Sequence, residues 1–196
     1  QLQLIADSIV GAALATAGAK RSAFDDRLKA NLDLAAEVVS QIKETGASVT
    51  GQMSTTMFFG NHEKGLGLFG ENWAHLWTDD LLGPPPCAAA EEVLQRTADG
   101  SLVWRVIEGR PYRTYRSCMS NPKWLAALKA MVRKGIEVGL DGFNATHHYE
   151  SYCHCDHCRE HARADLQDRL TEEEREALFG TTDMQQVANP FDAISS

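Results

Sequence analysis

Tyr152-Cys153-His154-Cys155-Asp156-His157-Cys158 is the most informative stretch of this chain. Its three cysteines have the spacing C-x-C-x-x-C, and the chain offers two further cysteines, Cys87 and Cys118, as a fourth ligand. Zinc favours four thiolate or imidazole ligands, and thiols this close in sequence converge when the chain turns tightly around an ion. The stretch therefore predicts a tetrahedral metal site with zinc as the metal, and a disulfide or redox cluster is the alternative.

Composition places the chain among globular proteins. It has 196 residues, of which 43% are hydrophobic and 23% charged, and this predicts one soluble unit. The net charge is -8, and the 19 Lys and Arg residues are scattered, which argues against a nucleic-acid partner. No apolar run is long enough to span a bilayer. Five cysteines, three of them crowded together, do not suit a secreted disulfide framework, so we expect reduced thiols and a cytoplasmic location.

The N-terminus allows two interpretations. Residues 9–17 are apolar and small, and residues 17–19 (Ala-Gly-Ala) are compatible with the cleavage site of a remnant signal peptide. No basic region precedes them, and Asp7 and Ser8 interrupt the apolar run. A buried strand over 8–15 is the favoured interpretation.

The next segments predict strand, helix and strand in succession. Apolar residues recur at steps of three and four, which places one face of a helix on Leu28, Leu32, Ala35, Val39 and Ile42. Gly46 ends this helix, and a strand follows over 47–53. This order of strand, helix and strand is typical of a unit that contributes strands to a parallel sheet.

Residues 54–86 lack periodicity and predict a long structured loop, which is usually functional. The loop is rich in aromatic and histidine side chains: Phe58, Phe59, His62, Phe69, Trp73, His75 and Trp77. Either these residues pack a small core of their own, or some of them line a carbohydrate cleft, because sugar rings stack on exposed aromatic faces.

The remaining elements continue the alternation of helices and strands. We expect a short helix over 88–96, a hairpin of 101–108 with 111–116, a helix after Asn121-Pro122, a strand over 140–147 and a helix over 159–170. Thr171 and Glu174 form a capping-box pattern that opens a last short helix. The chain is therefore α/β, but it shows too few strands for a closed (β/α)8 barrel, which needs eight strands and about 250 residues. It is either half of such a barrel or a smaller open sheet.

Two motifs resemble those of the bacterial β-galactosidase-like glycoside hydrolases and the wider group of TIM-barrel glycosyl hydrolases that carry a cysteine-bound zinc. One is Arg113-x-Tyr115 followed by C-x-S-x-P-x-W over 118–124, and the other is a strand followed within about nine residues by C-x-C-x-x-C. The looser similarity covers most of residues 33–191.

This resemblance implies a metal site and a fold. Its structural zinc would be held by Cys118, Cys153, Cys155 and Cys158, with His157 or His161 as a substitute if Cys118 lies far away. Residues 1–196 would form a single domain, roughly the first half of a partial (β/α)8 TIM-type barrel. That domain would be truncated at its C-terminus, and truncation at the N-terminus is open. Members of the family are often trimers, so a homo-oligomer is also open.

The resemblance further implies a glycoside hydrolase acting on a carbohydrate. The family has an Asn-Glu pair at the end of the strand before the cysteines, whereas here Asn144 is followed by Ala145. The catalytic role would then pass to Glu150, His147 or His148, with the nucleophile on a later strand. Substrate-binding candidates are Asn144, Arg113, His62, Trp73 and Trp77.

Two other functions stay open at the level of sequence. The missing glutamate favours a non-catalytic, zinc-stabilised barrel that binds carbohydrate or a protein partner. A zinc hydrolase that uses His147 and His148 as ligands is disfavoured, because adjacent residues on a strand point to opposite faces.

Overall fold

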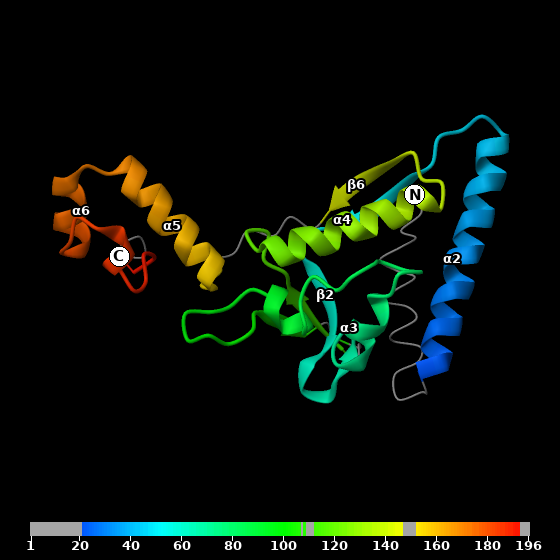
Figure 1. Ribbon diagram of the computed structural model, residues 1–196, viewed down its shortest axis with the longest axis horizontal. Helices are drawn as coiled ribbons and strands as arrows, with labels where there is room; N and C mark the ends of the chain where they lie inside the picture. The colour runs from blue at the N-terminus through cyan, green and yellow to red at the C-terminus, as the bar shows by residue number, and fades with distance from the viewer. Residues whose placement is uncertain (1–20, 107, 109–111, 147–151, 193–196) are drawn as a thin grey trace. The chain divides into compact units, whose positions relative to one another are not determined.

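The computed structural model describes residues 21–106, 108, 112–146 and 152–192 (Figure 1). It divides into a larger unit, residues 1–95 with 102–151, and a smaller unit, residues 96–101 with 152–196. The predicted strand over 8–15 lies outside the described residues.

The first described element of the larger unit is α2 (Arg21–Glu44), which confirms the predicted helix carrying Leu28 to Ile42. Its apolar face is buried as the spacing required, with Leu28, Ala35 and Val39 each 1% exposed. Gly46 lies two residues beyond the end of the helix. Its φ of +81° is in the left-handed region, and its N–H donates to the Lys43 carbonyl. A glycine is suited to this position because the left-handed region strains other residues.

The next strand, β1 (Thr50–Ser54), pairs in parallel with β6 (Gly142–Thr146). The register places Thr50 opposite Gly142 and Ser54 opposite Thr146. Asp141, immediately before β6, accepts hydrogen bonds from the backbone N–H of Val49 (2.8 Å) and from Lys43 Nζ (2.7 Å). The end of α2 and the start of both strands are thereby joined through one carboxylate.

Four shorter strands form an antiparallel sheet in the order β3-β2-β5-β4. They are β2 (Met57–Asn61), β3 (Leu66–Gly67), β4 (Trp104–Val106) and β5 (Arg113–Arg116). The pairing of β4 with β5 confirms the predicted hairpin. Strands β2 and β3 lie in a segment predicted to be a loop, because Met57-Phe58-Phe59-Gly60-Asn61 shows no alternation of apolar and polar residues. At Gly60 a Cβ would lie 2.4 Å from the Leu66 carbonyl oxygen, so the close approach of β3 requires glycine there.

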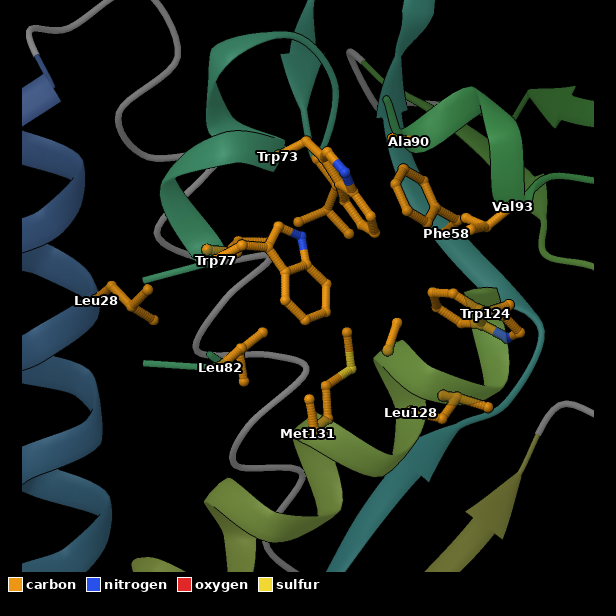
Figure 2. Close-up of a cluster of buried hydrophobic side chains, with 14 of the residues drawn as sticks. Leu28, Phe58, Trp73, Trp77, Leu82, Ala90, Val93, Trp124, Leu128 and Met131 are labelled. Atoms are coloured by element: carbon orange, nitrogen blue, oxygen red, sulfur yellow. The ribbon is translucent and has the colours of Figure 1, made fainter. Parts of the chain in front are cut away.

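Aromatic side chains from several elements meet in the core of the larger unit (Figure 2). Phe58 on β2 is fully buried, and its ring lies 6.0 Å from Trp73 and 6.2 Å from Trp124. Trp73 lies on α3 (Glu71–Leu76), and Trp124 lies on α4 (Pro122–Glu137). The N–H group of each indole has a hydrogen-bond acceptor in this apolar core: Trp73 Nε1 donates to the Cys87 carbonyl, and Trp124 Nε1 donates to the Thr55 carbonyl. The 3-10 helix η2 (Ala90–Val93) adds Ala90 and Val93 to the same cluster.

The smaller unit consists of α5 (Asp156–Arg169), α6 (Glu172–Phe179) and the 3-10 helix η3 (Met184–Gln186). The predicted capping box at the start of α6 is confirmed, with Glu174 N–H donating to Thr171 Oγ1 and Thr171 N–H donating to the Glu174 carboxylate. Arg175 is only 7% exposed, and its guanidinium donates to the carbonyls of Gln167, Leu170 and Thr182. One side chain thus caps the end of α5 and joins it to the segment after α6.

The described strands form one parallel pair and one four-stranded antiparallel sheet, and they do not close into a barrel. The fold of these residues is mixed α/β, as predicted, with helices and small sheets. None of the described helices is long and apolar enough to cross a membrane.

Replacing Trp73 by alanine is expected to destabilise the larger unit by about 3–5 kcal/mol, because the substitution leaves a large cavity in a packed core. The matched control is Trp104→Ala, whose indole is 45% exposed and lies against Arg113. This control should cost no more than about 1 kcal/mol, the scale of an exposed cation–π contact. Urea unfolding followed by far-UV circular dichroism measures the stability of both variants. Equal losses of stability would contradict the burial of Trp73 in this packed core.

Asp141→Asn is expected to lower stability at neutral pH. The hydrogen bond from Lys43 and that from the Val49 N–H hold the pKa of Asp141 below its usual range. A lowered folded-state pKa stabilises the protein above the unfolded value of about 4, and that contribution is lost as pH falls through the folded value. The difference between wild type and Asp141→Asn should therefore narrow below about pH 4.

Denaturation midpoints measured from pH 7 down to pH 3 test this expectation. The control is Asp33→Asn, which removes an exposed pair between Lys29 and Asp33 within α2 and should have a smaller effect. A difference for Asp141→Asn that stays constant with pH would contradict the role of its charge.

Candidate metal centre

The sulfur atoms of Cys118, Cys153, Cys155 and Cys158 all lie within 4.8 Å of one another. In a tetrahedral site with zinc–sulfur bonds of about 2.3 Å, the sulfur atoms are about 3.8 Å apart. The four thiols are therefore gathered at nearly the separation that a single ion requires. In the described part of the chain, this is the one group of three or more His, Cys, Asp or Glu side chains that converges in this way. This cluster could hold a metal ion.

Three of these thiols are set by the start of α5. Cys155 is the N-cap of this helix, with extended backbone angles, and Cys158 lies in its first turn. The N-terminus of a helix carries a partial positive charge, which favours thiolates over thiols. Cys153 precedes the helix, and its Sγ accepts a hydrogen bond from the backbone N–H of Arg96 over 3.5 Å. The local fold thus supplies two of the features that stabilise negative sulfur.

A backbone pairing fixes the segment that carries these thiols. The N–H of His154 donates to the Arg96 carbonyl over 2.8 Å, so Arg96 contacts both Cys153 and His154 through its main chain. The guanidinium of Arg159, on the first turn of α5, donates to the His154 carbonyl over 2.7 Å. These bonds join Cys153 and His154 to Arg96 and to the first turn of α5, and the spacing of the cysteines alone could not predict them.

The fourth thiol, Cys118, is positioned by the junction of β5 and α4. Its N–H donates to the Val93 carbonyl (2.9 Å), and its carbonyl accepts from the Asn121 N–H (3.1 Å). Asn121 is in turn the N-cap of α4, where its side chain accepts from the Lys123 N–H over 2.9 Å. Cys118 is 1% exposed. Its backbone is therefore bonded to the elements that precede and follow it.

Cys87 is not part of the cluster. Its thiol donates to the Ala89 carbonyl over 3.2 Å, and burial raises its pKa to about 11. The sequence spacing left Cys87 and Cys118 open as the fourth ligand, and the structure brings Cys118 to the site. His157 and His161 are not needed as substitutes. All five cysteines lie in the described part of the chain, and none of them forms a disulfide.

Comparison with known proteins gives no relative: no family model, no curated protein and no solved structure matches the chain. The similarity to glycoside hydrolases therefore rests on the two sequence motifs alone. The arrangement of the thiols stands independently of it.

The residues predicted to be catalytic, His147, His148 and Glu150, lie outside the described residues. Asn144 lies on β6 and is exposed. Across the parallel ladder, Gln52 is its direct partner, and Gln52 Nε2 donates to Thr146 Oγ1 over 3.2 Å. Polar side chains therefore occupy the C-terminal ends of both strands of the pair.

Arg113 and His62 belong to the antiparallel sheet and the turn beside it. Both terminal nitrogens of the Arg113 guanidinium donate to the Glu63 carboxylate, at 2.9 and 3.3 Å. The guanidinium also lies 4.0 Å from the centre of the Trp104 ring. The hydrogen bond from Arg113 holds the pKa of Glu63 below its usual range. His62 Nε2 lies 3.1 Å from Glu91 Oε1. The half-exposed Trp104 in this group was missed, because its hairpin position gave no sign that it meets Arg113.

Trp73 and Trp77 are core residues, which corrects the expectation that they stack on a sugar. They are 2% and 7% exposed, and their rings pack against each other with centres 5.2 Å apart (Figure 2). Neither indole presents a face to solvent. For these two tryptophans, the structure shows packing in a core and not the lining of a carbohydrate cleft.

Proposed function

We propose that this protein binds one zinc ion through Cys118, Cys153, Cys155 and Cys158, and that the ion is structural. The observation that carries the proposal is the convergence of the four sulfur atoms within 4.8 Å. Support also comes from the start of α5 and the Arg96 N–H, since both favour the thiolate form that binds metal.

The donor set favours zinc over other common metals. Thiolates bind zinc, copper(I) and iron–sulfur clusters, and a tetrahedral set of four sulfurs is typical of zinc or iron, whereas magnesium and calcium prefer oxygen ligands. Four thiolates close the tetrahedral shell of zinc and leave no position for water. The ion would therefore supply folding free energy, by linking the residues around Cys118 to those around Cys153, and would not activate a substrate.

Zinc binding is expected at one equivalent per chain. Cys158→Ser should weaken it by at least about tenfold, because even partners outside the ligand shell contribute this much. Cys87→Ser is the control: it also removes a thiol, but one that lies outside the cluster, and it should leave the stoichiometry at one. Competition with a chromogenic chelator measures both variants. A wild-type protein that holds no zinc, or equal losses in the two variants, would contradict the site.

We also propose a second function, that of a glycoside-hydrolase-like domain with a partial TIM-type barrel. The observation that favours it is the parallel β1–β6 pair, whose C-terminal ends carry Gln52, Asn144 and Thr146. Barrel enzymes keep their chemistry at the C-terminal ends of parallel strands. Asn144 would bind a sugar hydroxyl there, and His147, His148 or Glu150, which follow β6 in the sequence, would supply acid or base chemistry. The group of Arg113, His62 and Glu63 is a further polar surface suited to a saccharide.

Binding of the zinc-loaded chain to a glycan array tests this second function. We expect a galactoside-type ligand to be retained, and Asn144→Ala to weaken its binding by about tenfold, the effect of losing one hydrogen bond to a ligand. Gln41→Ala, an exposed amide on α2, is the control and should change nothing. Glycan binding supports either form of this function, and turnover of aryl galactosides would favour hydrolysis. A chain that retains no glycan would contradict both.

A further inference from the structure

Helix α5 carries a second set of metal-binding side chains that the cysteine cluster does not use. His157 and His161 are four residues apart, within the sequence His157-Cys158-Arg159-Glu160-His161. At 3.6 residues per turn, these two positions differ by only about 40° around the helix axis and by about 6 Å along it. Their imidazoles can therefore reach a common ion on the same face of the helix.

Both side chains are available for a ligand. His161 is exposed and His157 half-buried. Among the described residues, neither imidazole makes a hydrogen bond, an ion pair or a ring contact. His154 differs, because its ring packs 5.0 Å from Phe191. The pair at 157 and 161 thus has no structural role in the smaller unit that would explain its spacing.

The two histidines, His157 and His161, are separate from the four cysteines of the cluster. Neither imidazole belongs to the group of atoms that converges with Cys118. Two ligands from one helix leave most of the coordination shell of a metal to water or another molecule, unlike the closed shell of four thiolates. The two sites therefore differ in kind as well as in residues.

We propose that His157 and His161 form a second, open site for a divalent transition metal such as zinc, nickel or copper. Imidazole nitrogen suits these ions, and a helical pair of histidines one turn apart holds them at about 2.0–2.1 Å from each nitrogen. Glu160, in the same turn, adds a negative charge that attracts a cation. Asp165, one turn further on, is engaged with Arg169 at 2.6 Å and is not a ligand.

The sequence of this turn has a chemical consequence. The order H-x-x-E-H, with two metal-binding histidines and an adjacent glutamate on one helix, is a pattern that zinc hydrolases use. An ion with open positions next to a carboxylate can bind and polarise a ligand oxygen. This site would be independent of the structural zinc and of any carbohydrate.

Titration of the zinc-loaded protein with Ni²⁺ tests the second site. We expect the wild-type protein to bind one further equivalent of Ni²⁺. His157→Ala and His161→Ala should each weaken this binding about 100-fold or more, because the second ligand on a shared scaffold gives a large gain in affinity. His62→Ala, another exposed histidine, should bind Ni²⁺ as the wild type does. Retention of the extra equivalent in both α5 variants, or its absence in the wild type, would overturn the proposal.

Nuclear magnetic resonance gives a readout that does not depend on the thiols. Paramagnetic Ni²⁺ should broaden the ring signals of His157 and His161 first, at the lowest metal concentration, while the ring signals of His62 stay sharp. Uniform broadening of all histidines would show adventitious binding only and would overturn the site. Because this measurement follows the imidazoles themselves, a failure of the four-thiolate zinc site would not be mistaken for a failure of the second site.

Discussion

The larger unit depends on the burial of Phe58. Its ring is fully buried and contacts Phe69, Trp73 and Trp124 with centres 5.0–6.2 Å away. Edge-to-face and tilted aromatic contacts of this kind add to the free energy of burying their large apolar area. Because the partners come from the short α3 and the long α4, one side chain on a five-residue strand holds two helices to the antiparallel sheet. Helices as short as α3 are unstable alone, so this packing is what maintains them.

The metal centre rests on a different balance of forces. Four reduced thiols within 4.8 Å would repel one another as thiolates, and a bound cation removes that repulsion. Backbone N–H groups lie close to two of the sulfurs: Cys155 is at the N-terminus of α5, and the Arg96 N–H donates to Cys153 Sγ. The buried Cys87 is the contrast, because burial without such donors raises its pKa to about 11.

Several elements could be predicted because their signals are local. The apolar face of α2, the N-cap at Asn121 and the capping box of Thr171 and Glu174 each depend on residues within a few positions of one another. The strands β2 and β3 could not be predicted in the same way. Phe58 and Phe59 point to opposite faces of a sheet, but their pattern does not alternate, and the pairing with β5 joins residues far apart in the sequence. The same separation concealed the contact between Trp104 and Arg113.

Sequence patterns were enough to predict a metal cluster around Cys153, Cys155 and Cys158, the α/β class and the apolar face of α2. They did not predict α3, and they placed the start of α5 at 159 where the helix begins at Asp156. Spacing left Cys87 and Cys118 open and the family resemblance implied Cys118; the structure brings Cys118, and not Cys87, to the cluster. The burial of Trp73 and Trp77 in the core became visible only in the structure. The physical reason is the same in each case. Spacing reports which side chains can meet along one element, whereas the fourth thiol and the burial of an indole depend on chain segments that only folding brings together.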